Sequence, residues 1–151
     1  METTIVSYLA ARASRDLIVV GHQQITQEWW DARRLHYNLF ISELVIREAG
    51  AGDKGVAQRR LDALEEIPLL ELNEEALSLA GELAKRGPIP ARAKEDALHI
   101  ALATVHGMDF LLTWNCRHIA NAEMRAGIMA AALSQGYEAP VICTPEELIG
   151  E

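Results

Sequence analysis

Short apolar runs alternate along the chain with longer segments whose apolar residues recur at helical spacing, and this alternation constrains the fold most strongly. The apolar runs cover residues 38–42, 68–72, 109–113 and 141–143. The segments predicted to be helical cover residues 16–36, 43–49, 54–67, 73–86, 90–106 and 117–133. Because strands that alternate with helices form a mostly parallel sheet with helices on both faces, we predict an α/β fold.

Local signals add detail at both ends of the chain. Residues 3–6 are expected to end a β-rich segment, and the helix over residues 16–36 has a candidate interruption at Gly21. Asn73 is placed to cap the following helix, and the capping box at residues 144–147, with proline second, opens a short last helix. The segment 90–106 is apolar on nearly all sides, which predicts a buried helix.

The length of 151 residues suits one domain, which we place at residues 1–151. Cys116 and Cys143 lie far apart and form no C-x-x-C pair, so the sequence indicates neither a disulfide framework nor a zinc site with cysteine ligands. No segment resembles a signal peptide or a membrane span. We therefore expect a cytoplasmic protein with no membrane contact.

The net charge of −8 argues against a broad basic surface that would hold duplex DNA. The same charge is compatible with a metal-dependent nuclease, because carboxylates can hold the cations that meet the scissile phosphate. Charge therefore narrows the function classes without choosing among them.

Four polar residues fall where ligands gather in parallel sheets, beyond the carboxyl ends of strands or at a helix start. Glu2 precedes the Thr-Thr-Ile-Val segment, Glu48 follows the run at 38–42, and Asn115 follows the run at 109–113. Asp96 lies in the first turn of the predicted buried helix, where an unpartnered carboxylate would be costly. We predict that these four side chains converge.

These residues sit in four motifs whose order resembles the PIN domain, the nuclease fold of the VapC-like toxins of bacterial toxin-antitoxin pairs. The motifs are Glu2-Thr3-Thr4, Ile41-Ser42-Glu43-Leu44-Val45-Ile46-Arg47-Glu48, Glu95-Asp96-Ala97-Leu98-His99-Ile100-Ala101 and Leu112-Thr113-Trp114-Asn115. The resemblance implies a three-layer α/β/α domain around a central, mostly parallel sheet. Since only Met1 precedes Glu2, the first strand is expected to be truncated, and whether the natural chain begins upstream stays open.

The resemblance also implies an activity. Glu2, Glu48, Asp96 and Asn115 would hold Mg²⁺ or Mn²⁺ and hydrolyse phosphodiesters of single-stranded or structured RNA, leaving a 5′-phosphate and a 3′-hydroxyl. Such a ribonuclease is often a homodimer inhibited by an antitoxin protein. Two departures weaken the expectation of activity: Glu2 replaces the commoner Asp, and neutral Asn115 stands where many members have Asp. The alternative is a catalytically weak or inactive PIN-like module that acts through protein or RNA partners.

Supporting residues around the predicted site are Thr3, His99 and Thr113, and the RNA phosphate candidates are Arg12, Arg15, Arg92, Lys94 and Arg117. Plainer interpretations stay open: Glu48 as a solvated helix end, Asn115 as a helix cap, His99 as a satisfied buried polar group, and the arginines and lysine as ordinary surface charges. No second Asp-x-x-His pair completes a di-iron centre. Of Trp29 and Trp30, one is expected to pack inward.

Overall fold

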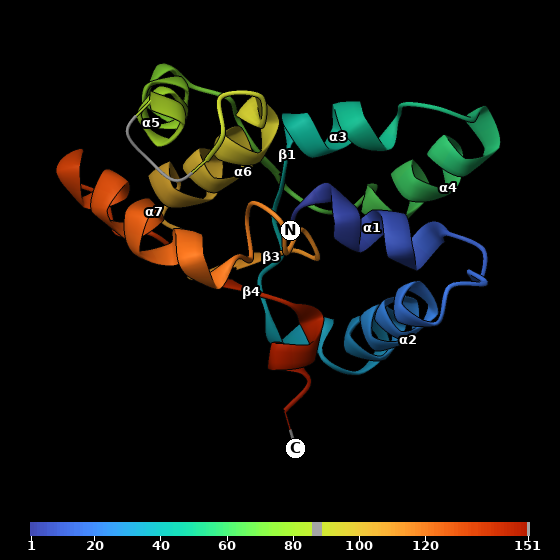
Figure 1. Ribbon diagram of the computed structural model, residues 1–151. Coiled ribbons are helices and arrows are strands. Elements are labelled where there is room, and N and C mark those ends of the chain that lie inside the picture. Colours follow the sequence, from blue (N-terminus) through green and yellow to red (C-terminus); the bar gives the residue numbers. More distant parts are fainter. Residues whose placement is uncertain (86–88, 151) are drawn as a thin grey trace.

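The computed structural model describes residues 1–85 and 89–150, and it is mixed α/β with helices predominating (Figure 1). The helices are α1 (Thr3–Ala10), α2 (Leu17–Ala32), α3 (Glu43–Ala49), α4 (Lys54–Leu64), α5 (Glu74–Lys85), α6 (Lys94–Val105) and α7 (Ala122–Ser134), with 3-10 turns η1 (Arg34–His36) and η2 (Pro145–Leu148). The strands are β1 (Ile41–Ser42), β2 (Leu69–Leu70), β3 (Phe110–Leu112) and β4 (Val141–Cys143). The predicted last residue of α5, at position 86, lies outside the described residues.

The strands pair in parallel, as predicted, but they form two separate two-stranded sheets rather than one. β1 pairs with β2, with Ile41 opposite Leu69, and β3 pairs with β4, with Phe110 opposite Val141. A three-layer arrangement around a continuous sheet is therefore not what the strand pairing shows. β1, β2 and β3 are shorter than the apolar runs that predicted them, whereas β4 matches its run, 141–143.

The first residues of the chain lie between the two sheets. The amino group of Met1 donates a hydrogen bond to Phe40 O at 2.7 Å, and Glu2 N donates to Leu112 O at 2.9 Å. Beyond Met1, a cavity of about 330 Å³ continues between residues 38–42 and residues 108–112. Met1 and Glu2 thus contact both sheets at one end of a slot whose length is not filled by a strand.

The prediction that residues 3–6 end a strand is wrong, because these residues begin α1. The Glu2 side chain caps the helix by accepting from Thr4 N, and Ile5 and Val6 become buried on its inner face. Two β-branched pairs in a row predicted extended backbone, but capping and burial decide the local structure here. The chain end, marked N, lies near the centre of the molecule in Figure 1.

Other helix boundaries also differ from the prediction: α4 ends at Leu64 rather than at residue 67, and α6 begins at Lys94 rather than at residue 90. α2 runs without interruption through Gly21, where a Cβ would meet nothing within 4 Å, and ends at Ala32 before η1. α7 begins at residue 122 rather than 117, because Asn121 caps it and accepts from Glu123 N at 2.9 Å. The segment 117–121 is left as a turn beside the loop after β3.

α6 is the buried helix that its apolar sequence predicts. Its buried residues face the main core, which also contains Leu79 and Leu83 of α5 and Ile128 of α7. Figure 1 shows α5, α6 and α7 grouped on one side and α1 to α4 on the other. No helix in the described residues is both long and apolar enough to cross a membrane.

Candidate functional site

Glu2, Glu48 and His99 come together from three different helices and form what we call the inner cluster. Each offers one possible ligand atom, and these atoms all lie within 4.8 Å of one another. Glu2 caps α1, Glu48 is in the last turn of α3, and His99 is in the second turn of α6. Glu2 is 5% exposed and His99 is 4% exposed, whereas the Glu48 side chain is 24% exposed, so the cluster is mostly buried and opens to water at Glu48.

Three hydroxyl and amide groups hold the Glu2 carboxylate. Oε2 accepts hydrogen bonds from Thr4 Oγ1 at 2.5 Å, from Thr113 Oγ1 at 2.7 Å and from Thr4 N at 3.2 Å. Buried carboxylates require such partners, because each unpaired oxygen otherwise carries the cost of leaving water. Among the described residues, no partner donates to the other oxygen, Oε1.

Glu48 is held in the same way from one side. Its Oε2 atom contacts Thr3 Oγ1 and lies 3.0 Å from His99 Nε2. Burial raises the pKa of the Glu48 carboxyl, but the hydrogen bonds from His99 and Thr3, with the charge of Arg47 behind them, outweigh burial and lower it. Glu48 is therefore an ionised ligand candidate, not the solvated helix end that its sequence position also allowed.

Asp96, Asn115 and His118 form a second group, which we call the outer cluster. Asn115 Nδ2 donates to Asp96 Oδ1 at 2.8 Å, and His118 Nδ1 lies 2.7 Å from Asp96 Oδ2. Asn115 Oδ1 accepts from His118 N at 3.1 Å, so the residue closes the turn after β3 instead of capping α7. Both oxygens of Asp96 thus have partners, as expected for a carboxylate at the start of an apolar helix.

Thr113 joins the two clusters. Its hydroxyl donates to Glu2 Oε2 and accepts from Asn115 N at 2.9 Å. The hydrogen bonds therefore run without a break from Glu2 through Thr113 and Asn115 to Asp96. Neighbouring Trp114 fixes the same loop, because its backbone N donates to Thr4 Oγ1 at 2.8 Å and its ring Nε1 to Thr26 Oγ1 at 2.7 Å.

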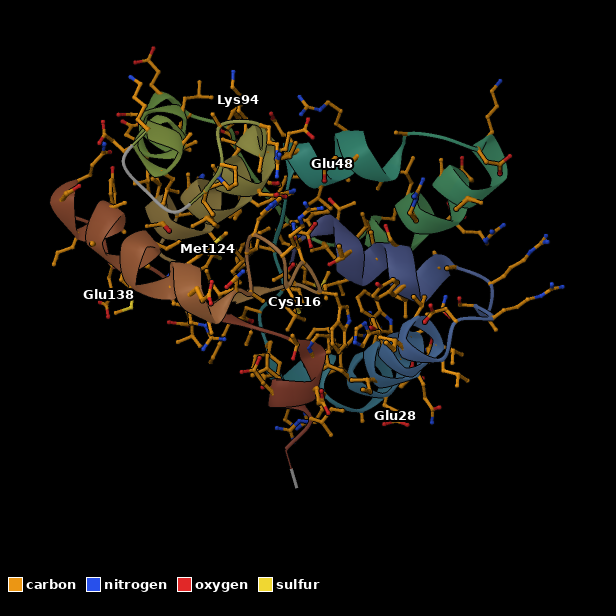
Figure 2. The ribbon with its side chains drawn as sticks, viewed as in Figure 1. Glu28, Glu48, Lys94, Cys116, Met124 and Glu138 are labelled. Carbon is orange, nitrogen blue, oxygen red and sulfur yellow. The ribbon has the colours of Figure 1, made fainter. Side chains whose placement is uncertain are left out.

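The four predicted ligands therefore divide into two pairs, Glu2 with Glu48 and Asp96 with Asn115. The supporting residues predicted for them do contact them: Thr3 and His99 contact Glu48, and Thr113 contacts Glu2. Figure 2 labels Glu48 on α3 and Lys94 at the start of α6, the two helices that the Glu48–His99 contact joins.

The predicted phosphate contacts fall in two places. Arg92, Lys94 and Arg117 line a hollow beside Asp96. Arg12 and Arg15 are exposed in the loop after α1, and no hydrogen bond joins their side chains to the clusters within the described residues. Trp29 is the indole that packs inward, whereas Trp30 stacks under Arg34 with the guanidinium 4.6 Å from the ring centre.

Two residues of the site were missed by sequence reasoning. Thr4 bonds both Glu2 and Trp114, and His118 bonds Asp96. The Asn-x-x-His spacing from Asn115 to His118 was a usable signal, because a polar side chain after a strand commonly accepts from the backbone three residues on. Nothing in the sequence distinguishes Thr4 from Thr3.

A family comparison decides what this arrangement belongs to. The PIN domain model matches residues 21–122, which is more than half of the 151 residues. The chain belongs to the PIN domain family. The part of the chain that matches the PIN domain model contains Glu48, Asp96 and Asn115, whereas Glu2 precedes it. Comparisons with curated proteins and with solved structures give no match.

The PIN domain is a nuclease fold, and the inner cluster is compatible with a metal site. Oxygen ligands suit Mg²⁺, whereas a site with an imidazole also suits Mn²⁺ or other transition ions. Glu2 and Glu48 each keep one oxygen that accepts no hydrogen bond from the described residues, so two oxygens are available without breaking a contact. The donor set of this PIN domain therefore fits a divalent cation.

Proposed function

We propose that the protein is a metal-dependent endoribonuclease that hydrolyses phosphodiesters of single-stranded RNA. The observation that carries the proposal is the inner cluster, in which two carboxylates and an imidazole offer ligand atoms within 4.8 Å of one another. Two carboxylates this close repel one another, and a cation between them would remove that repulsion. In a member of a nuclease family, the simplest use of that cation is phosphodiester hydrolysis.

Glu2 and Glu48 would hold Mg²⁺ or Mn²⁺ directly, and Asp96 and Asn115 would complete the site from the other side. When bound, the ion supplies an activated water molecule and a counter-charge for the phosphate. Thr3, Thr4 and Thr113 orient the carboxylates from behind, and His99 keeps Glu48 ionised. No side-chain nucleophile is required, and the products would be a 5′-phosphate and a 3′-hydroxyl.

We further propose that the chain acts as a VapC-like toxin, as a homodimer restrained by an antitoxin. Exposed apolar side chains supply material for such interfaces. Met129 and Leu133 lie four residues apart on α7 and are 64% and 75% exposed, and Leu17 and Ile18 are exposed at the start of α2. Large exposed apolar side chains that occur together are typical of protein contacts.

The test is cleavage of labelled single-stranded and hairpin RNA with Mg²⁺, with Mn²⁺ and with a chelator. We expect cleavage of the single-stranded RNA in both metals, none with the chelator, and 5′-phosphate ends on the products. Cleavage that survives the chelator, or its absence at saturating Mn²⁺, would reject the proposed reaction.

One observation favours a different function. Asn115 donates its amide N–H to Asp96 and accepts from His118 N, so it offers a cation only the remaining lone pair of a neutral oxygen and no charge. A site that lacks a fourth carboxylate binds cations more weakly. The second candidate is therefore a PIN-domain binding module with little catalysis, which would bind RNA or a protein partner yet leave RNA intact in the same assay.

A further inference from the structure

A hollow of about 600 Å³ opens beside the outer cluster. It is lined by residues 91–96 at the start of α6 and by Arg117 and His118 from the turn after β3. Arg92, Lys94 and Arg117 are exposed there. Three basic side chains in one hollow are unusual in a chain with a net charge of −8.

The acidic side chains in the hollow are engaged elsewhere. Glu95 pairs with Arg47 on α3 at 3.1 Å, and Asp96 is bonded by Asn115 and His118. Within residues 1–85 and 89–150, no ion pair involves Arg92, Lys94 or Arg117. With Glu95 paired to Arg47, three basic side chains face one carboxylate, Asp96, so the lining keeps a net positive charge that suits an anion.

The hollow also touches the candidate site directly. Asp96 and His118 line it, and Asp96 is joined through Asn115 and Thr113 to Glu2. His118 uses Nδ1 for Asp96, so Nε2 is the ring atom without a hydrogen bond to a described residue. An anion in the hollow would therefore lie next to the residues proposed to act on a phosphodiester.

The chemistry of the lining suits a phosphate. Arginine binds phosphate oxygens with two parallel N–H bonds, and lysine adds a mobile point charge. The α6 backbone reinforces this, because Ala93 gives the helix start no side-chain cap and leaves first-turn amides beside the charges. A nucleic-acid strand that enters the site must place a neighbouring phosphate about one nucleotide away.

We propose that this hollow binds a backbone phosphate of single-stranded RNA adjacent to the phosphodiester that is cut. The inference rests on the proposed function and adds a second anchor to it. It makes Arg92 and Arg117 substrate-binding residues, with Lys94 contributing charge at the rim. A strand with several phosphates should therefore bind better than a dinucleotide, which carries a single one.

The test measures the affinity of a fluorescent six-nucleotide RNA by anisotropy, once with a chelator and once with Ca²⁺, over a series of salt concentrations. The variant is Arg92→Ala/Arg117→Ala. The matched control is Lys54→Ala/Arg59→Ala, which removes the same charge from exposed positions on α4. We expect the variant to weaken binding by about tenfold and to lower the salt slope by about 0.7 for each phosphate that it no longer neutralises. The control should stay near the parent, and a dinucleotide should bind parent and variant alike.

Equal affinities of parent and variant for the six-nucleotide RNA overturn the subsite, as does an equal loss in the control. A parent that binds no RNA in either buffer also overturns it. Selective loss of binding in the variant, with no cleavage by the parent in Mn²⁺, supports the subsite and rejects only the hydrolytic function.

Discussion

The inner and outer clusters each pair a carboxylate with a histidine, yet their surroundings differ. Glu48 of α3 meets His99 of α6, and the imidazole is only 4% exposed although the carboxylate is 24% exposed. Asp96 meets His118 at the edge of an open hollow, where the side chains are 22% and 15% exposed. The histidine of the inner pair is therefore part of the packed interior, whereas the histidine of the outer pair is not. Under the proposed function, the inner pair would serve both folding and cation binding, and the outer pair would meet substrate.

The largest effect should come from the outer carboxylate. We expect Asp96→Asn to reduce metal-dependent RNA cleavage by at least about a hundredfold, because it removes charge next to the proposed cation. The amide can still accept from Asn115, so the thermal midpoint should stay close to that of the parent. The measurement combines initial cleavage rates at saturating Mg²⁺ with thermal unfolding. Equal rates for parent and variant would mean that the outer cluster is not part of the reaction.

Replacing each histidine in turn tests most directly which pair supports the fold. We expect His99→Leu to lower the free energy of unfolding by roughly 2 kcal/mol, because Glu48 loses a partner while remaining half-buried. His118→Leu should cost less than about 1 kcal/mol, since Asp96 keeps Asn115 and access to water. Urea unfolding of both variants gives the two values. A larger loss for His118→Leu than for His99→Leu would reverse the comparison.

A smaller effect concerns the slot beside the inner cluster. Burial lowers the pKa of the Met1 amino group from 8.0 to about 6, so the unfolded chain binds more protons than the folded one between these values. Stability should therefore rise as pH increases from about 6 to 8. The expected rise is roughly 1 to 2 kcal/mol, which is less than the full pKa difference would give, because Met1 is partly exposed to water. Urea unfolding at a series of pH values across this window measures the rise.

Extending the chain ahead of Met1 tests the same feature. About five residues with apolar side chains at alternate positions should raise stability and remove the rise between pH 6 and 8, because an amide replaces the amine and a strand can fill the slot. A Gly-Ser extension of equal length is the control, since it removes the amine without filling the slot. If the proteins with the two extensions unfold at the same temperature, the slot does not accept a strand.

Much of the fold follows from local patterns in the sequence. Asn73 caps a helix as predicted, and Ser42 and Asp53 cap helices at polar positions that precede helical spacing. Such caps can be read from sequence because the side chain accepts from a backbone N–H only three residues ahead. The alternation of strands and helices predicted the parallel pairings, because a helix between two strands brings the chain back so that both strands run in the same direction. The prediction of a strand at residues 3–6 was wrong, because the helix cap from the Glu2 side chain and burial against the core outweigh β propensity. The division into two sheets could not be predicted, because it depends on what occupies the space between β1 and β3.

The sequence predicted which residues belong to the candidate site better than it predicted which of them contact one another. Carboxylates that follow strands or begin buried helices were identifiable one by one, since an acidic residue beside apolar sequence needs a reason. Which oxygen meets which donor depends on the packing of α3 against α6 and on the turn after β3. That packing separates Glu48 from Asp96 into different clusters, and no spacing along the chain shows it. His118 was overlooked because its partner lies 22 residues away.

The anchoring of Trp114 has a consequence for how a ligand would be received. The indole stacks on His22 with ring centres 4.0 Å apart, and its ring N–H reaches Thr26 on α2. The backbone N–H of Trp114 reaches Thr4 on α1, so the loop that carries Asn115 is tied to both helices. The conformational entropy of ordering that loop is lost when the chain folds, and a ligand arriving later does not lose it again. If the site binds RNA as proposed, this loop would therefore favour strands that already have a fitting shape, because it is fixed before they arrive.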